Sequence, residues 1–136
     1  MRFDTKIAIA VRDDLAVWQR LNVTAFLAGG IAAGVPETAG KPYEDGSGQQ
    51  YLELFRQPVL VFAADGPLLS TVRERAVRRD LATAIYTEDL FATDNDDDNR
   101  AAVRAVATGE LNLVGVAVYG PRNGVDKVFK GAVLHP

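Results

Sequence analysis

The stretch from Arg12 to Gly34 constrains the fold of this chain more than any other, because its second half carries no charge. Residues 21–36 contain no Asp, Glu, Lys or Arg. A helix at the surface of a globular domain normally keeps a charged face toward water. We therefore expect a helix that is covered on more than one side, by its own domain or by a second subunit, and we predict a homodimer.

One stripe within this helix has the spacing of an apolar helical face. Its members are Trp18, Leu21 or Asn22, Ala25, Gly29, and Ala32 or Ala33. The small residues of the stripe would let the helix backbone approach a sheet closely. Asp13 and Asp14 precede the helix, and carboxylates at that place favour capping of its first turn.

Apolar runs alternate with helical segments along the chain. The predicted strands are Lys6–Val11, Val59–Ala64, Leu81–Thr87 and Leu113–Tyr119, with a short closing strand at Ala132–Leu134. Pro67 suits the first turn of a helix after the second strand. A further helix is predicted to open at Asp94–Asp98 and to stop at Gly109. Strands that alternate with helices predict an α/β layered domain.

The 136 residues favour a single domain, residues 1–136. A Gly/Pro-rich excursion at 34–57 interrupts it. Asp45–Gly48 is a turn signal in the middle of this segment and predicts a small two-stranded hairpin there.

Composition excludes several chemistries. The chain has no cysteine and one histidine, His135, which is predicted to lie in a frayed tail. Ser47 and Ser70 do not sit on a strand-to-helix elbow, so a Ser-His-Asp triad is not expected. A histidine or thiolate metal site is excluded by count. No glycine-rich dinucleotide or phosphate loop follows a strand, so no cofactor is predicted.

The acidic run resembles a calcium loop in spacing only. Asp94, Asp96 and Asp98 alternate correctly, but Asn99 and Ala105 stand where the loop requires glycine and glutamate. We interpret the run as a solvated helix N-terminus. The net charge of −3 argues against sequence-independent nucleic-acid binding, although four arginines cluster between residues 73 and 79. Without a basic leader or a long apolar run, we expect a cytoplasmic protein that does not enter a membrane.

Polar side chains follow two of the predicted strands where each strand ends. Asp13 and Asp14 follow the first, and Tyr86, Thr87, Glu88 and Asp89 end or follow the third. If these strands are parallel and adjacent, the groups share one sheet edge, which is where open α/β sheets place ligands. The predicted ligand-binding residues are Arg12, Asp13, Asn22, Thr87 and Glu88. Glu88 and Asp89 are the candidate catalytic carboxylates.

Several strings resemble type-two peptidyl-tRNA hydrolases in order and spacing. They are Val11-Arg12 with Asp14-Leu15, Gln57–Val61, Leu113–Val116, Gly120-Pro121, and Val125–Val128 with Gly131. This resemblance implies a three-layer α/β domain with a mixed sheet of about four core strands. Leu21–Leu27, Gln57-Pro58, Asn99–Ala101 and Val114-Gly115 resemble more closely an uncharacterised bacterial family of that superfamily, the domain of unknown function number two thousand.

The chain departs from the hydrolase pattern at the catalytic positions. Residues 18–21 contain no lysine where the hydrolases carry one, and residues 86–91 lack the Asp-Ala-Gly-x-Thr loop. No catalytic residue is therefore carried over. Three functions follow as hypotheses: a domain that binds a small polar ligand, a divergent hydrolase of an ester or amide such as peptidyl-tRNA, or a structural subunit of a complex.

Overall fold

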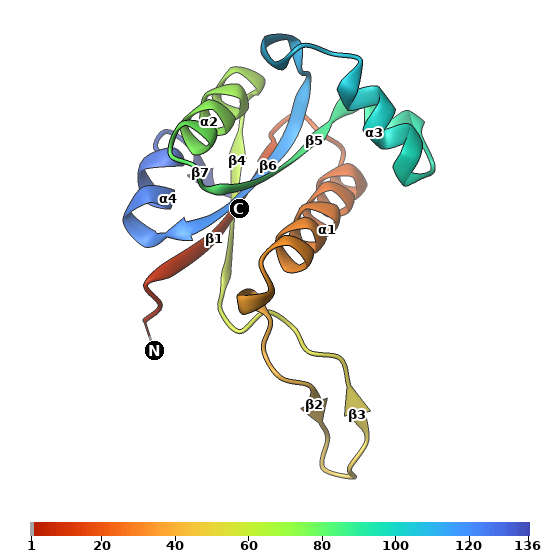
Figure 1. Cartoon of the computed structure of the whole chain (residues 1–136), viewed down its shortest axis with the longest axis vertical. Helices are drawn as coiled ribbons and strands as arrows, with labels where there is room; N and C mark the ends of the chain where they lie inside the picture. The colour runs from red at the N-terminus through yellow and green to blue at the C-terminus, as the bar shows by residue number, and fades with distance from the viewer. Residues whose placement is uncertain (1) are drawn as a thin grey trace.

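The computed structural model describes residues 2–136 and is shown in Figure 1. Its strands are β1 (Thr5–Arg12), β2 (Tyr43–Glu44), β3 (Gln50–Tyr51), β4 (Val59–Ala64), β5 (Ala82–Thr87), β6 (Leu113–Pro121) and β7 (Val133–Leu134). Its α-helices are α1 (Val17–Gly34), α2 (Gly66–Arg78), α3 (Asp96–Arg104) and α4 (Arg122–Val128). Three short 3-10 helices are η1 (Pro36–Thr38), η2 (Glu88–Ala92) and η3 (Thr108–Glu110). The predicted α/β class is confirmed. No helix in this part of the chain is long and apolar enough to cross a bilayer.

Five strands form one mixed sheet in the order β5-β6-β1-β4-β7. Strands β1 and β4 run parallel, and the other neighbouring pairs are antiparallel. The sheet thus consists of the four predicted core strands and the predicted short closing strand, which is β7. The first and third predicted strands, β1 and β5, are parallel but not adjacent, because β6 lies between them. The antiparallel β6 begins at the edge where β1 and β5 end, so it adds its own N-terminal residues to that edge.

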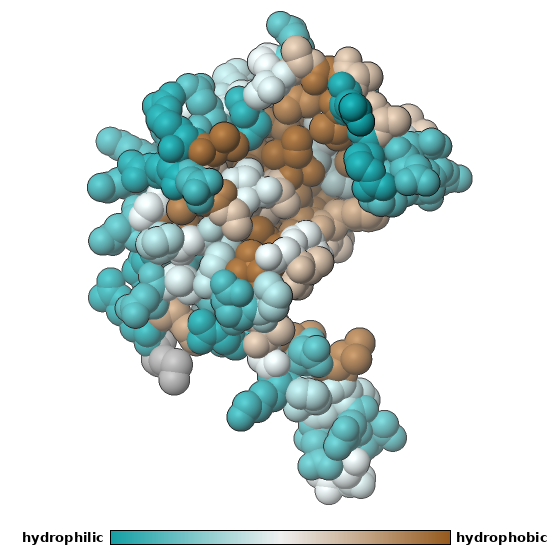
Figure 2. All heavy atoms as spheres, viewed as in Figure 1, coloured by the Kyte–Doolittle hydropathy of each residue, from teal (hydrophilic) through white to brown (hydrophobic). Residues whose placement is uncertain are grey.

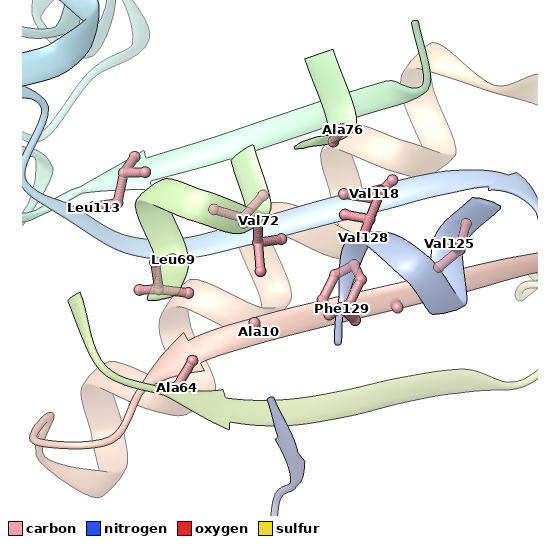
Figure 3. Close-up of a cluster of buried hydrophobic side chains, with 12 residues drawn as sticks. Ala10, Ala64, Leu69, Val72, Ala76, Leu113, Val118, Val125, Val128 and Phe129 are labelled. Atoms are coloured by element: carbon pink, nitrogen blue, oxygen red, sulfur yellow. The ribbon is translucent and has the colours of Figure 1, made fainter. Parts of the chain in front are cut away.

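Helices cover both faces of the sheet and form three layers. Helix α1 packs on one face, over a cluster that includes Ile7, Ile9, Val11 and Val114. Helices α2 and α4 pack on the other face, over alternate residues of the same strands, as Figure 3 shows for Ala10 and Val118. This alternation follows from the two-residue period of a strand, which turns successive side chains to opposite faces.

Helix α1 buries a different stripe from the predicted one. Val23, Leu27 and Ile31 face the sheet. The predicted stripe faces solvent instead: Trp18 and Leu21 are 62% and 67% exposed. An uncharged helix offers no solvated face by which the buried side can be recognised, and its branched and long side chains fill the core better than Ala and Gly.

The predicted cap of α1 is also wrong. The N-cap residue is Ala16, whose N–H donates to the side chain of Gln19 at 3.0 Å. Asp14 caps no helix; its carboxylate accepts from Arg12 Nε at 2.6 Å. Asp13 donates its backbone N–H to Ala64 at 2.9 Å, which ties the end of β1 to the end of β4.

The Gly/Pro-rich excursion forms a projecting arm, residues 39–56. Its tip is the β2–β3 hairpin, as predicted, with the Asp45 carboxylate accepting the N–H groups of Ser47 and Gln49. The base of the arm is closed by the Ala39–Phe55 bridge. In Figure 1 the arm extends away from the three layers beyond the C-terminal end of α1.

The C-terminal tail is tied down, against the prediction that it frays. The N–H of His135 donates to Val61 at 2.9 Å and extends the β4–β7 ladder. Part of the predicted basic cluster is likewise engaged within the fold. Arg75 donates to the carbonyls of Val128 and Lys130, where α4 ends, and Arg78 pairs with Glu74.

Gly115 on β6 is the position where α1 comes closest to the sheet. A Cβ at Gly115 would lie 2.5 Å from Val23 and 2.8 Å from Leu27, both of them buried. We predict that Gly115→Ala lowers the free energy of unfolding by about 1–3 kcal/mol, the usual cost of an overpacked core. Urea denaturation measures the loss. Gly109→Ala is the control, because nothing lies within 4 Å of its added Cβ; equal losses in both variants would contradict the prediction.

Candidate functional site

A cavity of about 460 Å³ lies between the N-terminal half of α1, the end of β5 and the start of α3. We call it the aromatic chamber. Its lining residues are Trp18, Asn22, Phe26, Tyr86, Leu90, Phe91, Thr93, Asp94, Asn95, Asp96 and Asn99. Ligand sites in proteins are typically concave and apolar, with a few polar groups that fix orientation. This cavity is concave and combines five aromatic or aliphatic side chains with six polar ones, so it is more polar than a typical ligand site.

Local structure brings the chamber together from three segments. Trp18, Asn22 and Phe26 recur at intervals of four, so they share one side of α1. Tyr86 lies at the end of β5 and its ring is in the cluster beneath α1. The chain then turns through η2, which carries Phe91, and continues into α3.

Four aromatic rings form an unbroken series along the chamber. Trp18 meets Phe91 edge-on with ring centroids 5.8 Å apart, and Phe91 meets Tyr86 at 5.3 Å. Tyr86 in turn meets Phe26 edge-on at 5.6 Å. These separations are those of favourable aromatic pairs. The two outer rings remain largely exposed, at 62% for Trp18 and 56% for Phe26, so the series opens to solvent at both ends.

Tyr86 and Asn22 form the polar centre of the chamber. Tyr86 is buried, and its hydroxyl accepts a hydrogen bond from Asn22 Nδ2 at 3.3 Å. Burial raises the pKa of the Tyr86 hydroxyl above its usual value, and the hydrogen bond from Asn22 opposes this in part. The hydroxyl therefore stays protonated at neutral pH and retains its own proton for donation.

The start of α3 gives the chamber an acidic rim. Asn95 caps α3, accepting from the N–H of Asp98 at 2.9 Å. Asp94 and Asp96 line the chamber on either side of this cap. Arg100 pairs with Asp96 at 2.7 Å and with Asp97. Within residues 2–136, Asp94 makes no ion pair, so its charge is available at the rim.

A second cavity of about 440 Å³ continues from the aromatic chamber. Both are lined by Phe26, Tyr86, Leu90, Asp96 and Asn99. The second adds Leu27, Gly30, Ala84, Ile85, Arg100, Val103 and Arg104. The two together make an elongated groove between α1 and α3, with its aromatic half at one end and its more aliphatic half at the other.

The predicted binding residues gather in part, but away from the groove. The Arg12 guanidinium donates to Asp14 and, at 3.0 Å, to Asn112; it lies 3.6 Å from Glu88. Glu88 also accepts from the side chain of Asn112. This cluster joins the segments after β1 and β5 to the one before β6. The Arg12 guanidinium also holds the pKa of Asp14 below its usual value.

The remaining predicted residues do not join that cluster through their side chains. Asn22 lines the aromatic chamber instead. Thr87 is buried, and its hydroxyl makes no hydrogen bond with any described residue. Asp13 and Asp89 are exposed at the surface. Asn22 is thus the one residue of the predicted set that lines the aromatic chamber.

Sequence reasoning missed most of the chamber. The sequence pattern predicts a packing stripe for Trp18 and a solvated helix end for Asp94 and Asp96, and it gives no indication of a role for Phe91. The available signal was the Trp18, Asn22, Phe26 spacing, an aromatic-polar-aromatic series on one helix side. Among residues 2–136, no three His, Asp or Glu side chains converge as a metal site would require.

Comparisons with known proteins identify relatives without a described activity. The family described as "Protein of unknown function (DUF2000)" matches residues 5–136. The chain is similar to a solved structure, the protein of unknown function Atu0240 from Agrobacterium tumefaciens strain C58, at 47% identity and a TM-score of 0.95. That match covers 99% of this chain and 100% of the other. No curated protein matches the chain.

The raised pKa of Tyr86 predicts a specific loss of stability in alkali. A group whose pKa is higher in the folded than in the unfolded state favours folding below the unfolded pKa. This contribution disappears as the pH rises from about 10, the pKa of a free tyrosine, through the raised value. We expect the wild-type protein to lose more stability than Tyr86→Phe over that interval in urea titrations. Equal losses of stability in the wild-type protein and in Tyr86→Phe would contradict the raised pKa of Tyr86.

Proposed function

The chain belongs to the DUF2000 family of proteins of unknown function, and we propose that this member binds a small organic cation in the aromatic chamber. The cation is an alkylated amine whose charged head lies against the row of four rings and whose apolar body extends into the second cavity. The observation that carries the proposal is the contact series Trp18, Phe91, Tyr86 and Phe26 around a cavity with an acidic rim.

Aromatic rings favour a cation over a neutral ligand of the same shape. The face of each ring carries negative charge density, which attracts an ammonium group placed over it. Such contacts contribute about 0.5 kcal/mol at exposed sites and about 2 kcal/mol when water is excluded. Trp18 is the strongest partner of the four by ring type, and it lies at one of the two exposed ends of the series.

The charges at the rim favour the same sign of ligand. Asp94 has no ion-pair partner among the described residues, and Arg100 is already paired with Asp96 and Asp97. An anion at the first turn of α3 would meet these carboxylates, and the N–H of Asp98 is already taken by Asn95. Both effects oppose a phosphate or carboxylate ligand, which otherwise favours a helix N-terminus.

The second cavity determines which chemical group suits the remainder of the ligand. Its lining next to the chamber is aliphatic, with Leu27, Ala84 and Val103. Burial of apolar surface contributes about 25 cal/mol per Å². A ligand with an alkyl chain attached to its ammonium group therefore gains affinity over the bare head group, which makes an alkylamine a better fit than a compact ion.

Binding of choline and of 3,3-dimethylbutan-1-ol tests the charge requirement. The two molecules have nearly the same shape, and only choline is charged. We expect choline to bind and the neutral alcohol to bind at least about tenfold more weakly, a difference of about 1.4 kcal/mol. Isothermal titration calorimetry measures both. Equal affinities, or no binding of choline and of hexyltrimethylammonium, would refute the proposal.

Variants locate the binding to the chamber. Trp18→Leu and Asp94→Asn should each weaken choline binding several-fold, and raised salt should reduce the effect of Asp94→Asn because it screens exposed charges. Asp80→Asn is the matched control. It removes an exposed carboxylate just before the start of β5, at the opposite end of that strand from Tyr86, and its positive φ of 57° suits asparagine. A loss as large in Asp80→Asn would mean that net charge alone drives binding.

The geometry favours binding over hydrolysis. Glu88 is held by Arg12 and Asn112, and it does not line the chamber. Arg20, which could otherwise hold an anionic substrate, donates to the carbonyls of Leu15 and Asp13. The acidic rim also opposes a substrate that carries RNA phosphates.

A further inference from the structure

The projecting arm exposes apolar side chains that its own chain leaves uncovered. Leu52 is 84% exposed and Leu54 65%, and Tyr43 and Tyr51 are more than half exposed. The β2–β3 ladder itself consists of two residue pairs. A lone two-stranded hairpin is at best marginally stable in water. An arm of this kind gains stability when its apolar side rests on another surface.

The solvent side of α1 likewise lacks the charged residues that a surface exposed to water normally carries. Its exposed positions include Leu21, Ala25, Gly29 and Ala32, and no charged residue occurs from Leu21 to the end of the helix. Figure 2 shows the surface over α1 largely in white to brown, with teal concentrated on α3 and on the opposite side of the body. The small residues leave a shallow surface on which another chain segment can approach the helix backbone.

A groove joins these two surfaces into one. It has a volume of about 560 Å³ and runs between the C-terminal half of α1 and the base of the arm. Ala28, Gly29, Ala32, Ala39, Glu53, Leu54 and Phe55 line it. The groove is therefore mostly apolar. The groove can accept an apolar segment of another chain. The arm beside it is such a segment, and it projects away from its own three layers.

We propose that the solvent side of α1 and the arm form a homodimer interface, in which the arm of each copy lies along α1 of the other. The same chain supplies both halves of the contact, which is the requirement for a two-fold interface. This proposal does not depend on the cationic ligand, because Ala25, Ala32 and Leu52 do not line the aromatic chamber.

The exposed apolar area of the arm and α1 is large enough for a second copy of the chain to cover. Outside the aromatic chamber, the large exposed apolar side chains of the two surfaces are Val17, Leu21, Tyr43, Tyr51, Leu52 and Leu54. At about 100 Å² each they amount to roughly 600 Å² per copy, which is the lower end of one partner's contribution to a stable protein interface. A short peptide or a small molecule would cover only part of this surface.

Light scattering on a sizing column tests the mass. We expect the wild-type protein to elute at twice the 14.7 kDa of one chain. Ala25→Arg and Leu52→Glu, one on each surface, should each shift the protein toward the monomer and raise the dimer dissociation constant at least about tenfold. Val77→Arg is the control, because Val77 is also exposed but lies on α2, on the opposite face of the sheet. Circular dichroism verifies that the variants remain folded.

Crosslinking tests which surfaces meet. The chain has no cysteine, so single-cysteine variants carry one reactive thiol each. A mixture of Leu52→Cys and Ala32→Cys chains, one of them tagged, should form the mixed product with a short bismaleimide. A mixture of Leu52→Cys and Val77→Cys chains should not. A wild-type monomer at 100 µM, a dimer that only Val77→Arg disrupts, or no mixed arm-to-helix product would overturn the proposal.

Discussion

The packing of α1 on the sheet is the interaction on which the rest of the structure depends. Val23, Leu27 and Ile31 reach the sheet, and Gly115 lets the first two approach β6 without a Cβ in between. Because one narrow stripe attaches the helix to the sheet, the other sides of the helix do not pack on the core. One side carries Trp18, Asn22 and Phe26 over the aromatic chamber, and another faces solvent beside the arm.

The candidate site follows from that division. Tyr86, the last residue but one of β5, contacts Phe26 of α1, and the turn through η2 adds Phe91, which contacts both Tyr86 and Trp18 near the start of α1. The acidic start of α3 then follows in the chain only a few residues later. The chamber thus depends on the order of three adjoining segments and on one helical spacing, without any glycine-rich or histidine-containing motif.

Much of the fold was predictable because strands are recognised from local patterns, namely short apolar runs bounded by turn residues. β4 was predicted to the residue, and the hairpin was predicted from its turn. Register between distant segments was harder: β6 inserts between β1 and β5, a tertiary pairing that no local pattern encodes. The buried stripe of α1 was wrong for a related reason. In an uncharged helix, the choice between Leu27 and Leu21 is made by the shape of the sheet beneath it.

The site was predictable in even smaller part. Arg12 and Glu88 do come together, but their side chains connect the loops at the edge of the sheet. The sequence alone does not distinguish a structural pair of this kind from a pair that binds a ligand. Of the predicted binding residues, Asn22 alone lines the aromatic chamber. Aromatic residues are the usual content of a core, so their use as a chamber wall becomes visible only when their exposed fractions are known.

Helix α3 gives the groove an unusual boundary. None of its nine residues is buried, and the hydroxyl of Thr93 bonded to Asn99 is one of the few side-chain links between it and the preceding segment. Moving this helix outward exposes little apolar surface, so the free energy of that motion is far below that of unfolding the body. The α3 wall of the groove is thus less firmly packed than the α1 wall, where Val23, Leu27 and Ile31 are buried. For the proposed ligand, an outward shift of α3 would accommodate molecules of different width, and selectivity would come from the rings and charges of the chamber.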